Sequence, residues 1–355
     1  MLRNTVYKLK NDKSLRVAYF GGSITEGAGS SDPEKYCYRA KFTKYLKEKF
    51  PDSEITEIYA AIGGTGTSLG MFRVNKDVLE YDPDLVFVEF ATNDFGDTEE
   101  NVLPQTESII RRIRKTLPYC DIVFLFSTAL MVKEELDAGG KFVSKIAQKK
   151  ATDHYGVLSI DFGDYFLDYI YNKMNKKYED YAPDTLHPGD NGYAVITDYI
   201  ISVLDPILNA EPTDELCAHA LIEKLSPIAS DKGDIIYPAD LVGLELSGFE
   251  LVNEKYDRFP SYLAAEKGGS EFTFTFVGSG FGFYRAPGDA GADFIVNVDG
   301  GEDILNLSWD REVRSFRRMA NAVVTKKLED KLHTIKVKVA GDGEFSTRIG
   351  GIFVC

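Results

Sequence analysis

Short apolar runs alternate with longer helical patterns over residues 16–206. The runs are rich in β-branched and aromatic residues, and several are apolar almost throughout, as strands buried on both faces are. The predicted strands are 16–20, 54–60, 84–90, 121–126 and 157–161. The predicted helices are 35–49, 68–80, 98–116, 134–154 and 190–204. This alternation predicts an α/β domain with a parallel, doubly wound sheet of about five strands, whose ligand lies beyond their carboxyl ends.

The pattern changes after about residue 207, where the helical periodicity fades. EFTFTFVGSGFGFYR (271–285) alternates polar and aromatic residues with period two and then turns through glycines. The same combination of strand and turn returns in 293–303, 332–345 and 348–354. These patterns predict three parts, namely an α/β domain (1–206), a linker (207–232) and an antiparallel, jelly-roll-like β-sandwich (233–355).

The chain of 355 residues carries a formal net charge of −15. This acidity argues against nucleic acid and anionic membranes as partners, because phosphate groups require a basic surface. No apolar stretch approaches the roughly 18–20 residues of a membrane span, and the charged N-terminus does not resemble a signal peptide. The four cysteines and four histidines are scattered. We therefore expect a cytoplasmic protein with unpaired thiols and no metal centre.

The first chemical motif is FGGSITEG (20–27), which follows the first predicted strand directly. A serine between glycines at the end of a strand, just before a helix, projects its hydroxyl into the ligand crevice. The helix N-terminus there favours a developing negative charge. An N-capping serine in a glycine turn is the plainer interpretation of Ser23. The α/β-hydrolase motif G-x-S-x-G does not fit, because Thr25 occupies the position of its second glycine.

Two further motifs follow the next strands. AAIGGTGTS (60–68) holds glycines that let backbone N–H groups approach a ligand, although a tight turn explains them equally. A dinucleotide fingerprint is incomplete, because Leu69 stands where its third glycine belongs. The third motif, Asn93-Asp94, ends an apolar strand. It is interpreted either as a turn cap or as a side-chain amide donor to an oxyanion.

The fourth motif is DTLHP (184–188), which precedes the last helix of the first domain. An aspartate three residues before a histidine can accept a hydrogen bond from the imidazole and fix its tautomer. The other ring nitrogen of His187 then remains free to take a proton from a serine. A histidine beside a proline is otherwise an ordinary loop residue. His154, His219 and His333 are given no catalytic role.

In this order, the four motifs resemble those of the SGNH (GDSL-like) hydrolase family of lipases and acylhydrolases. The resemblance covers roughly residues 15–206 and implies a flavodoxin-like three-layer α/β/α fold. It also implies hydrolysis of acyl esters without a cofactor or metal. Carried over to this sequence, it makes Ser23 the nucleophile, His187 the general base and Asp184 its orienting partner. The oxyanion donors that it implies are the N–H groups of Ser23 and Gly64 and the Asn93 amide.

Two positions depart from the family pattern. The usual G-D-S is here Gly21-Gly22-Ser23, so the aspartate that often braces the loop is absent. The usual glycine of G-x-N-D is Ala91. Neither change removes a catalytic group, but the first leaves open how the loop that carries Ser23 is held.

The C-terminal half resembles the accessory domains of some carbohydrate esterases, including acetyl-xylan esterases. That resemblance implies an acetylated oligosaccharide as substrate. The aromatics Phe281, Phe283, Tyr284 and Trp309 are candidates for stacking on sugar, and at least half of them are expected in the core instead. A domain that only stabilises the first, or that makes a homodimer contact, is the alternative.

Several functions fit the sequence. The leading prediction is a serine esterase that removes short acyl groups, above all acetyl, from carbohydrate esters. A broad short-chain lipase or acylhydrolase uses the same chemistry on another small-molecule ester, and transfer of the acyl group to a sugar would use the same residues. A non-catalytic carbohydrate-binding protein on a hydrolase frame is the alternative from a different class.

Overall fold

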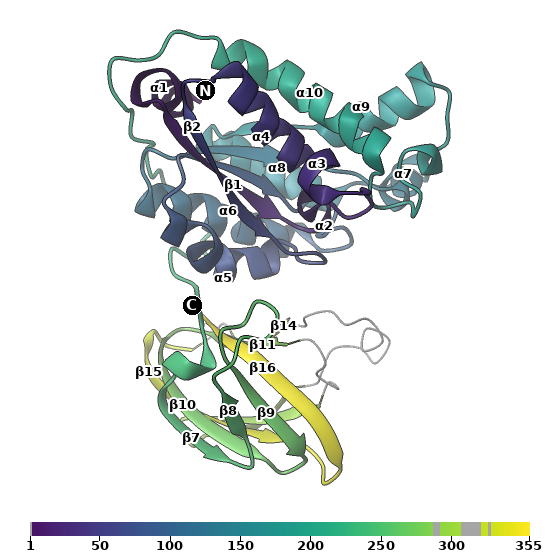
Figure 1. Cartoon of the computed structure of the whole chain (residues 1–355). Helices are drawn as coiled ribbons and strands as arrows, with labels where there is room; N and C mark the ends of the chain where they lie inside the picture. The colour runs from purple at the N-terminus through teal and green to yellow at the C-terminus, as the bar shows by residue number, and fades with distance from the viewer. Residues whose placement is uncertain (1, 287–291, 307–320, 326–327) are drawn as a thin grey trace. The chain divides into compact units, whose positions relative to one another are not determined.

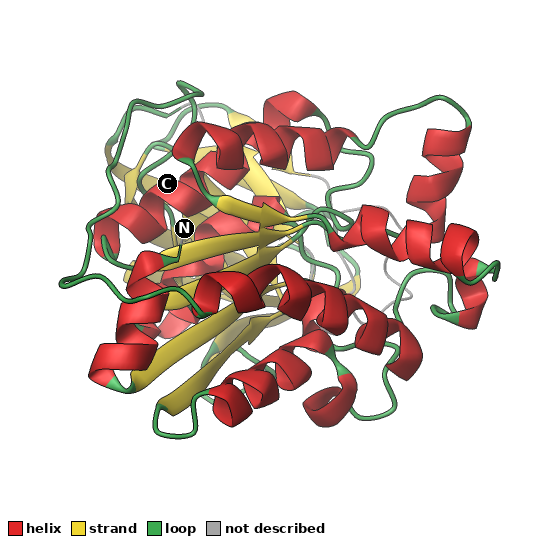
Figure 2. Ribbon diagram, turned by 90° about the horizontal axis from the view of Figure 1, so that it is seen from above, coloured by secondary structure: helices red, strands yellow, loops and turns green. Residues whose placement is uncertain are grey.

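The computed structural model divides into two compact units, Met1–Lys232 and Gly233–Cys355 (Figure 1). It describes residues 2–286, 292–306, 321–325 and 328–355. Within these residues the α-helices, red in Figure 2, all belong to the first unit. No helix in this described part of the chain is long and apolar enough to span a membrane.

Five parallel strands form the sheet of the first unit, in the order β2-β1-β3-β4-β5. Their bounds are β1 Ser14–Gly21, β2 Glu54–Ala61, β3 Leu85–Glu89, β4 Asp121–Leu125 and β5 Leu158–Ile160. This order is flavodoxin-like, with its switch point between β1 and β3. β3 and β4 are buried along their whole length, which explains why their sequences are apolar almost throughout. The predicted parallel sheet is therefore confirmed.

Helices cover both faces of this sheet, with α1, α4, α9 and α10 on one face and α5, α6 and α8 on the other (Figure 1). The helices are α1 Arg3–Tyr7, α2 Ser23–Glu26, α3 Pro33–Tyr36, α4 Tyr38–Lys49, α5 Thr67–Asp77, α6 Glu99–Thr116, α7 Leu130–Asp137, α8 Val143–Tyr155, α9 Phe162–Asp168 and α10 Asp190–Leu208. Short turns of other helix types are η1 Lys8–Asp12, η2 Leu79–Tyr81, η3 Tyr169–Lys173 and η4 Tyr178–Asp180. The three-layer α/β/α fold is confirmed. However, α1 and α9 were not predicted, and the predicted helix 134–154 is interrupted between α7 and α8.

The register of the sheet brings three strand ends to one edge. Gly21, the last residue of β1, pairs with Ala61 of β2 on one side and with Glu89 of β3 on the other. The loops that follow these strands contain the first three chemical motifs of the sequence. Parallel pairing in this register therefore places those motifs side by side, at the edge where α/β sheets bind ligands.

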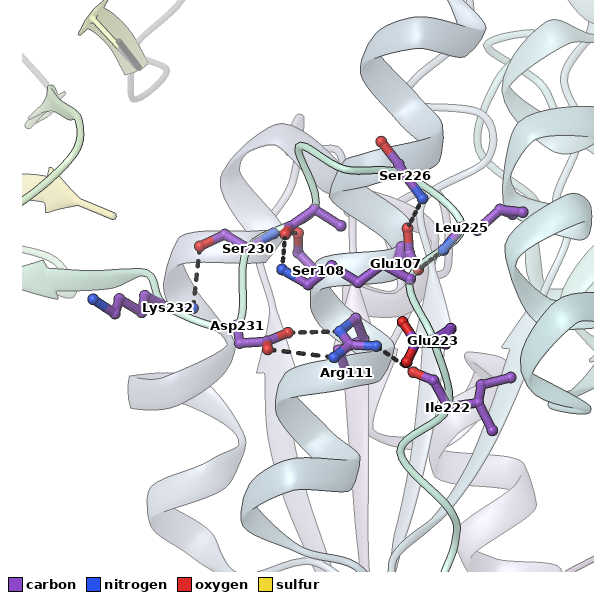
Figure 3. Close-up of polar contacts among 12 residues, drawn as sticks. Glu107, Ser108, Arg111, Ile222, Glu223, Leu225, Ser226, Ser230, Asp231 and Lys232 are labelled. Atoms are coloured by element: carbon purple, nitrogen blue, oxygen red, sulfur yellow. Dashed lines mark hydrogen bonds and ion pairs between the residues drawn. The ribbon is translucent and has the colours of Figure 1, made fainter. Parts of the chain in front are cut away.

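The predicted linker (207–232) begins within the end of α10, and its remainder, 209–232, belongs to the first compact unit. Helix α6 binds the last part of this segment (Figure 3). The buried Glu107 carboxylate accepts hydrogen bonds from the N–H groups of Leu225 and Ser226, at 2.6 and 2.7 Å. On burial, the carboxylate and the two N–H groups lose their hydrogen bonds with water, and the bonds between them replace these. The segment is thus held through hydrogen bonds of its backbone. The hydrophobic pattern of the sequence gives no sign of such bonds.

Arg111 and Ser108 continue this binding site for the segment (Figure 3). The Arg111 guanidinium donates to both carboxylate oxygens of Asp231, at 2.6 and 3.3 Å, and to the Ile222 carbonyl at 2.7 Å. The Ser108 hydroxyl accepts from the N–H of Ser230 at 2.8 Å. Charged and hydroxyl groups of one helix therefore bind four backbone groups and one carboxylate between residues 222 and 231.

Replacing Glu107 with alanine is expected to lower the free energy of unfolding of the first unit by about 2–5 kcal/mol. The change leaves the two N–H groups of Leu225 and Ser226 without their acceptor in a buried site. Urea denaturation measures the loss, and limited proteolysis should show faster cleavage within 209–232. Glu100→Ala, at an exposed position of the same helix, is the matched control. Equal stability of the two variants would refute this role of Glu107.

Two antiparallel sheets form the second unit, which confirms the predicted β-sandwich. One has the order β13-β12-β15-β10-β7, and the other has the order β14-β11-β16-β9-β8, with β6 paired to β16. The strands are β6 Asp234–Ile236, β7 Val242–Ser247, β8 Glu250–Val252, β9 Tyr262–Lys267, β10 Glu271–Gly278, β11 Phe281–Arg285, β12 Phe294–Val298, β13 Asp303–Asn306, β14 Asn321–Thr325, β15 Lys331–Val339 and β16 Glu344–Val354. A 3-10 turn, η5, covers Pro238–Asp240.

Aromatic side chains fill the interior of the sandwich. The phenylalanines of β10 point inward and alternate with less buried threonines, as the period of two predicts. Phe281, Phe283 and Tyr284 of β11 are also buried, with at most 2% of their surface exposed. These three candidates for stacking on sugar are therefore core residues, which was the alternative for at least half of the set. Trp309 lies outside the described residues.

Candidate active site

Ser23 is the first residue of α2 and follows β1 after Gly22 alone. Gly22 packs directly against Asn93, since a β-carbon at position 22 would lie 2.0 Å from the Asn93 Oδ1. Only glycine permits this contact between the loops that follow β1 and β3. Ser23 therefore lies at the carboxyl edge of the sheet, beside the third chemical motif.

Ser23, His187 and Asp184 form a continuous series of hydrogen bonds. The Ser23 Oγ lies 2.8 Å from the His187 Nε2, although the two residues are 164 positions apart in the sequence. The His187 Nδ1 lies 2.6 Å from the Asp184 Oδ2. An ionised carboxylate can only accept, so the proton is on Nδ1, and Nε2 accepts the hydroxyl proton of Ser23.

Asp184 also shapes the loop that carries His187. Its Oδ1 accepts from the N–H groups of Leu186 and His187, at 3.0 and 2.6 Å. Partial burial favours the neutral acid, but the hydrogen bonds from the His187 ring and from these N–H groups outweigh it and lower the pKa of Asp184. The carboxylate is therefore ionised at neutral pH and holds the imidazole in one orientation.

The groups predicted to bind an oxyanion come from three loops beside Ser23. Among the described residues, the N–H groups of Ser23 and Gly64 and the side-chain amide of Asn93 have no hydrogen-bond partner. Gly64 has a φ of +73°, a conformation that favours glycine. A β-carbon on Gly63 would lie 3.5 Å from the Ser23 Cβ, so this loop borders the serine. Such unpaired donors are available to a ligand.

Arg73 of α5, which the sequence did not single out, ties these loops together. Its buried guanidinium donates to the carbonyl oxygens of Gly21 and Ala60, at 2.8 and 2.7 Å, and to the Thr65 hydroxyl at 3.3 Å. One side chain therefore fixes the ends of β1 and β2 and the loop after β2. An arginine in a helix carries no local signal of this role, because its acceptors come from distant segments.

Asp94 is buried beneath the same loop. Its Oδ1 accepts from the Thr67 N–H at 2.9 Å, and its Oδ2 lies 2.8 Å from both the Thr67 hydroxyl and the Gln148 amide nitrogen. Burial raises the pKa of Asp94 to about 7, although the donors from Thr67 and Gln148 oppose the rise. The Thr67 hydroxyl also donates to the Gln105 Oε1 at 2.8 Å, so its single proton serves two acceptors. A protonated Asp94 supplies the second proton.

Replacing Asp94 with asparagine is expected to stabilise the protein more at pH 8 than at pH 5. A carboxyl group with a raised pKa stabilises the fold fully below its unfolded pKa of about 4, and this stability is lost as the pH rises to about 7. The free energy of unfolding of the wild type should therefore fall by about 2–3 kcal/mol between pH 5 and pH 8 through this group, and that of Asp94→Asn should not. The asparagine amide can donate to the Gln148 Oε1, which is buried without a partner among the described residues, after that side chain flips.

Thermal unfolding of both proteins at the two pH values measures this effect. The wild type at each pH is the control for every other titrating group. An equal difference in Tm between the proteins at pH 5 and at pH 8 would show that Asp94 does not titrate in this range.

The described residues contain no group of three or more histidine, cysteine, aspartate or glutamate side chains arranged to hold a metal ion. The four cysteines, which all lie within the described residues, form no disulfide with one another, and Cys37 and Cys120 are buried. The functional groups at this edge of the sheet are thus a hydroxyl, an imidazole, a carboxylate and unpaired N–H donors.

A hydroxyl, an imidazole and a carboxylate in one series of hydrogen bonds, beside unpaired N–H donors, are the groups that a carboxylic ester hydrolase uses. The chain belongs to the GDSL-like lipase/acylhydrolase family, whose model matches residues 19–195. The match spans all four motifs. No curated protein matches the chain by sequence.

Solved structures share the fold over both units. A two-domain esterase (CEX) active on acetylated mannans aligns with a TM-score of 0.83 and 21% sequence identity, covering 100% of this chain and 95% of that one. The structure of a two-domain esterase (CEX) active on acetylated mannans co-crystallized with mannopentaose aligns with a TM-score of 0.81 and 21% identity, covering 99% and 94%. The combination of an α/β unit with a β-sandwich is therefore shared with an esterase of known structure.

Proposed function

We propose that this protein is a serine esterase that removes acetyl groups from carbohydrate esters. The observation that carries the proposal is the series from the Ser23 Oγ to the His187 Nε2, at 2.8 Å, and from the His187 Nδ1 to Asp184, at 2.6 Å. A nucleophile, a base and a group that orients the base stand here in one line of hydrogen bonds. Ser23 is the nucleophile, His187 the general base and Asp184 the orienting group.

In the first half of the reaction, the Ser23 Oγ attacks the ester carbonyl while His187 Nε2 takes its proton. The carbonyl oxygen becomes an oxyanion, which receives hydrogen bonds from the N–H groups of Ser23 and Gly64 and from the Asn93 amide. The carbon–oxygen bond to the sugar then breaks. His187 returns its proton to the departing sugar oxygen, and the acetyl group remains on Ser23.

In the second half, water attacks the acetyl carbonyl with His187 as the base. The second tetrahedral intermediate collapses, acetate leaves, and the proton returns to the Ser23 Oγ. Asp184 remains ionised throughout, because its pKa is lowered by the bonds from the His187 ring and backbone. Its charge stabilises the imidazolium that forms in both steps.

The substrate class is inferred from similarity over the whole chain. The aligned esterase is active on acetylated mannans, and the alignment includes the β-sandwich as well as the α/β unit. The strongly acidic chain also favours neutral sugars over anionic esters as ligands. A short acyl group attached to an oligosaccharide is therefore the substrate that we propose.

Acetate release from acetylated manno- and xylo-oligosaccharides, compared with hydrolysis of p-nitrophenyl acetate, butyrate and octanoate, tests this function. We expect the highest kcat/KM on an acetylated oligosaccharide and a steep decline from acetate to octanoate. Higher kcat/KM on simple short-chain esters than on every acetylated sugar would favour the broad acylhydrolase instead. A sugar acceptor in the assay would reveal acyl transfer as a new sugar ester in place of free acetate.

A further inference from the structure

A buried carboxylate lies beneath the turn that carries Ser23. Glu89 is the last residue of β3 and has no exposed surface. Its Oε2 accepts from the Thr25 hydroxyl at 3.0 Å, and its Oε1 accepts from the Ser127 hydroxyl at 2.5 Å. Burial raises the pKa of Glu89, and these two donors oppose the rise. A buried acid with such specific partners is costly to keep and calls for a function.

Two more hydroxyl groups extend this arrangement, which we name the Glu89 network (Glu89, Thr25, Tyr38, Ser127 and Thr92). The Tyr38 hydroxyl lies 2.8 Å from the Thr25 Oγ1, and the Thr92 hydroxyl lies 2.7 Å from the Ser127 Oγ. Thr25 and Ser127 each have one proton and donate it to Glu89, so Tyr38 donates to Thr25 and Thr92 donates to Ser127. Every hydroxyl proton therefore points along the chain toward the carboxylate.

The network joins the segments that carry the proposed catalytic groups. Thr25 belongs to α2, two residues after Ser23, and Thr92 directly precedes Asn93. Ser127 follows β4 on the far side of Glu89. Glycine at position 21 is required for this contact, because a β-carbon there would lie 2.1 Å from the Thr25 Oγ1. Three loops at the edge of the sheet are thus tied to one carboxylate.

We propose that Glu89 is a positioning residue, which acts through Thr25 and Ser127 to hold the Ser23 turn in register with the Asn93 loop. The proposal rests on the proposed roles of Ser23 and Asn93. It explains how the turn is held although Gly22 replaces the aspartate of the G-D-S pattern. The residue that holds the turn is thus Glu89, at the end of β3, and does not belong to the turn itself.

Replacing Thr25 with valine tests the proposal, because valine keeps the shape of the side chain and removes only the hydroxyl. We expect kcat on p-nitrophenyl acetate to fall roughly 10- to 100-fold with little change in KM. When the Ser23 turn and the Asn93 loop are out of register, their groups stabilise the transition state less, whereas binding of the substrate changes little. The rate at which a fluorophosphonate labels Ser23 should fall by a similar factor. Thr25→Ser restores the hydroxyl and should keep most of the wild-type kcat.

Thr43→Val is the matched control. Thr43 is also a buried threonine of the first unit, and its hydroxyl lies 2.9 Å from that of Tyr19, but it does not contact the site. Thr25→Val removes two buried hydrogen bonds, with Glu89 and Tyr38, and Thr43→Val removes one, with Tyr19. Both variants should therefore lose stability, Thr25→Val the more. Only Thr25→Val should lose kcat.

Equal kcat in the two valine variants would overturn the positioning role. If Thr25→Val does not fold, Glu89→Gln supplies the same test, because an amide nitrogen cannot accept from a hydroxyl and breaks one arm of the network. Glu89→Gln with wild-type kcat would likewise overturn the proposal. Failure of the proposed function has a different signature, namely that the wild type itself hydrolyses no ester and takes no fluorophosphonate at Ser23.

Discussion

Ser23→Ala is expected to lower kcat/KM on acetyl esters by roughly 10⁴- to 10⁶-fold, the range seen when a hydrolase loses its nucleophile. The loss follows from the proposed mechanism, in which the Ser23 Oγ forms the covalent bond to the acyl group. No other hydroxyl group is recorded within hydrogen-bond distance of the His187 Nε2 among the described residues. Steady-state acetate release, with mass spectrometry of the fluorophosphonate-treated protein, measures both activity and labelling.

The substitution should leave the fold intact, since the Ser23 side chain makes a single recorded hydrogen bond. Ser202→Ala is a suitable control, because Ser202 is an exposed residue of α10. We expect it to retain full activity and full labelling of Ser23. Turnover by Ser23→Ala at the wild-type rate would refute the nucleophile assignment and, with it, the proposed mechanism.

Asn93→Ala is expected to lower kcat by about 10²- to 10³-fold, the typical cost of losing one oxyanion donor. KM should change little, because the donor acts on charge that develops only in the transition state. The amide is held against Gly22 and has no hydrogen-bond partner among the described residues, so it is oriented before the substrate binds. Separate determination of kcat and KM on p-nitrophenyl acetate measures the effect.

Asn93→Asp sharpens this experiment. Aspartate has the same size, but it has no donor when ionised and places a negative charge beside the oxyanion. We therefore expect a larger loss of kcat than in Asn93→Ala. A rise in KM with unchanged kcat in both variants would show instead that Asn93 binds the substrate in its ground state.

Much of the first unit could be predicted from its sequence. The parallel strands are buried on both faces, so their residues are apolar whichever neighbours they have, and the ends of the runs mark the ends of β1 to β5 closely. The strand order was expected from the family resemblance. By contrast, α1 lacks a long periodic pattern, and its buried residues contact distant parts of the chain, including Asp121 and Cys217.

The second unit shows where periodicity stops being informative. The alternation in β10 correctly predicted which phenylalanines point inward. In β11 all five residues are buried, so neither face of this strand is exposed to solvent and an alternating pattern cannot identify the inward face. Whether Phe281, Phe283 and Tyr284 meet sugar or core depends on what covers the second face of that strand, which is a property of the assembled sandwich.

The sequence by itself determined which reactive side chains follow which strands, because a strand, its turn and the next helix are encoded by residues that are neighbours in the chain. The common edge of parallel strands then placed Ser23, Gly64 and Asn93 in one region. Only the tertiary structure decided what holds them. Glu89 binds Thr25 across 64 positions and Ser127 across 38, and Glu107 binds Ser226 across 119. In the sequence, the polar residues that make these contacts look like an ordinary strand end, helix residue or linker residue. Their partners lie far away in the chain and come close only when it has folded.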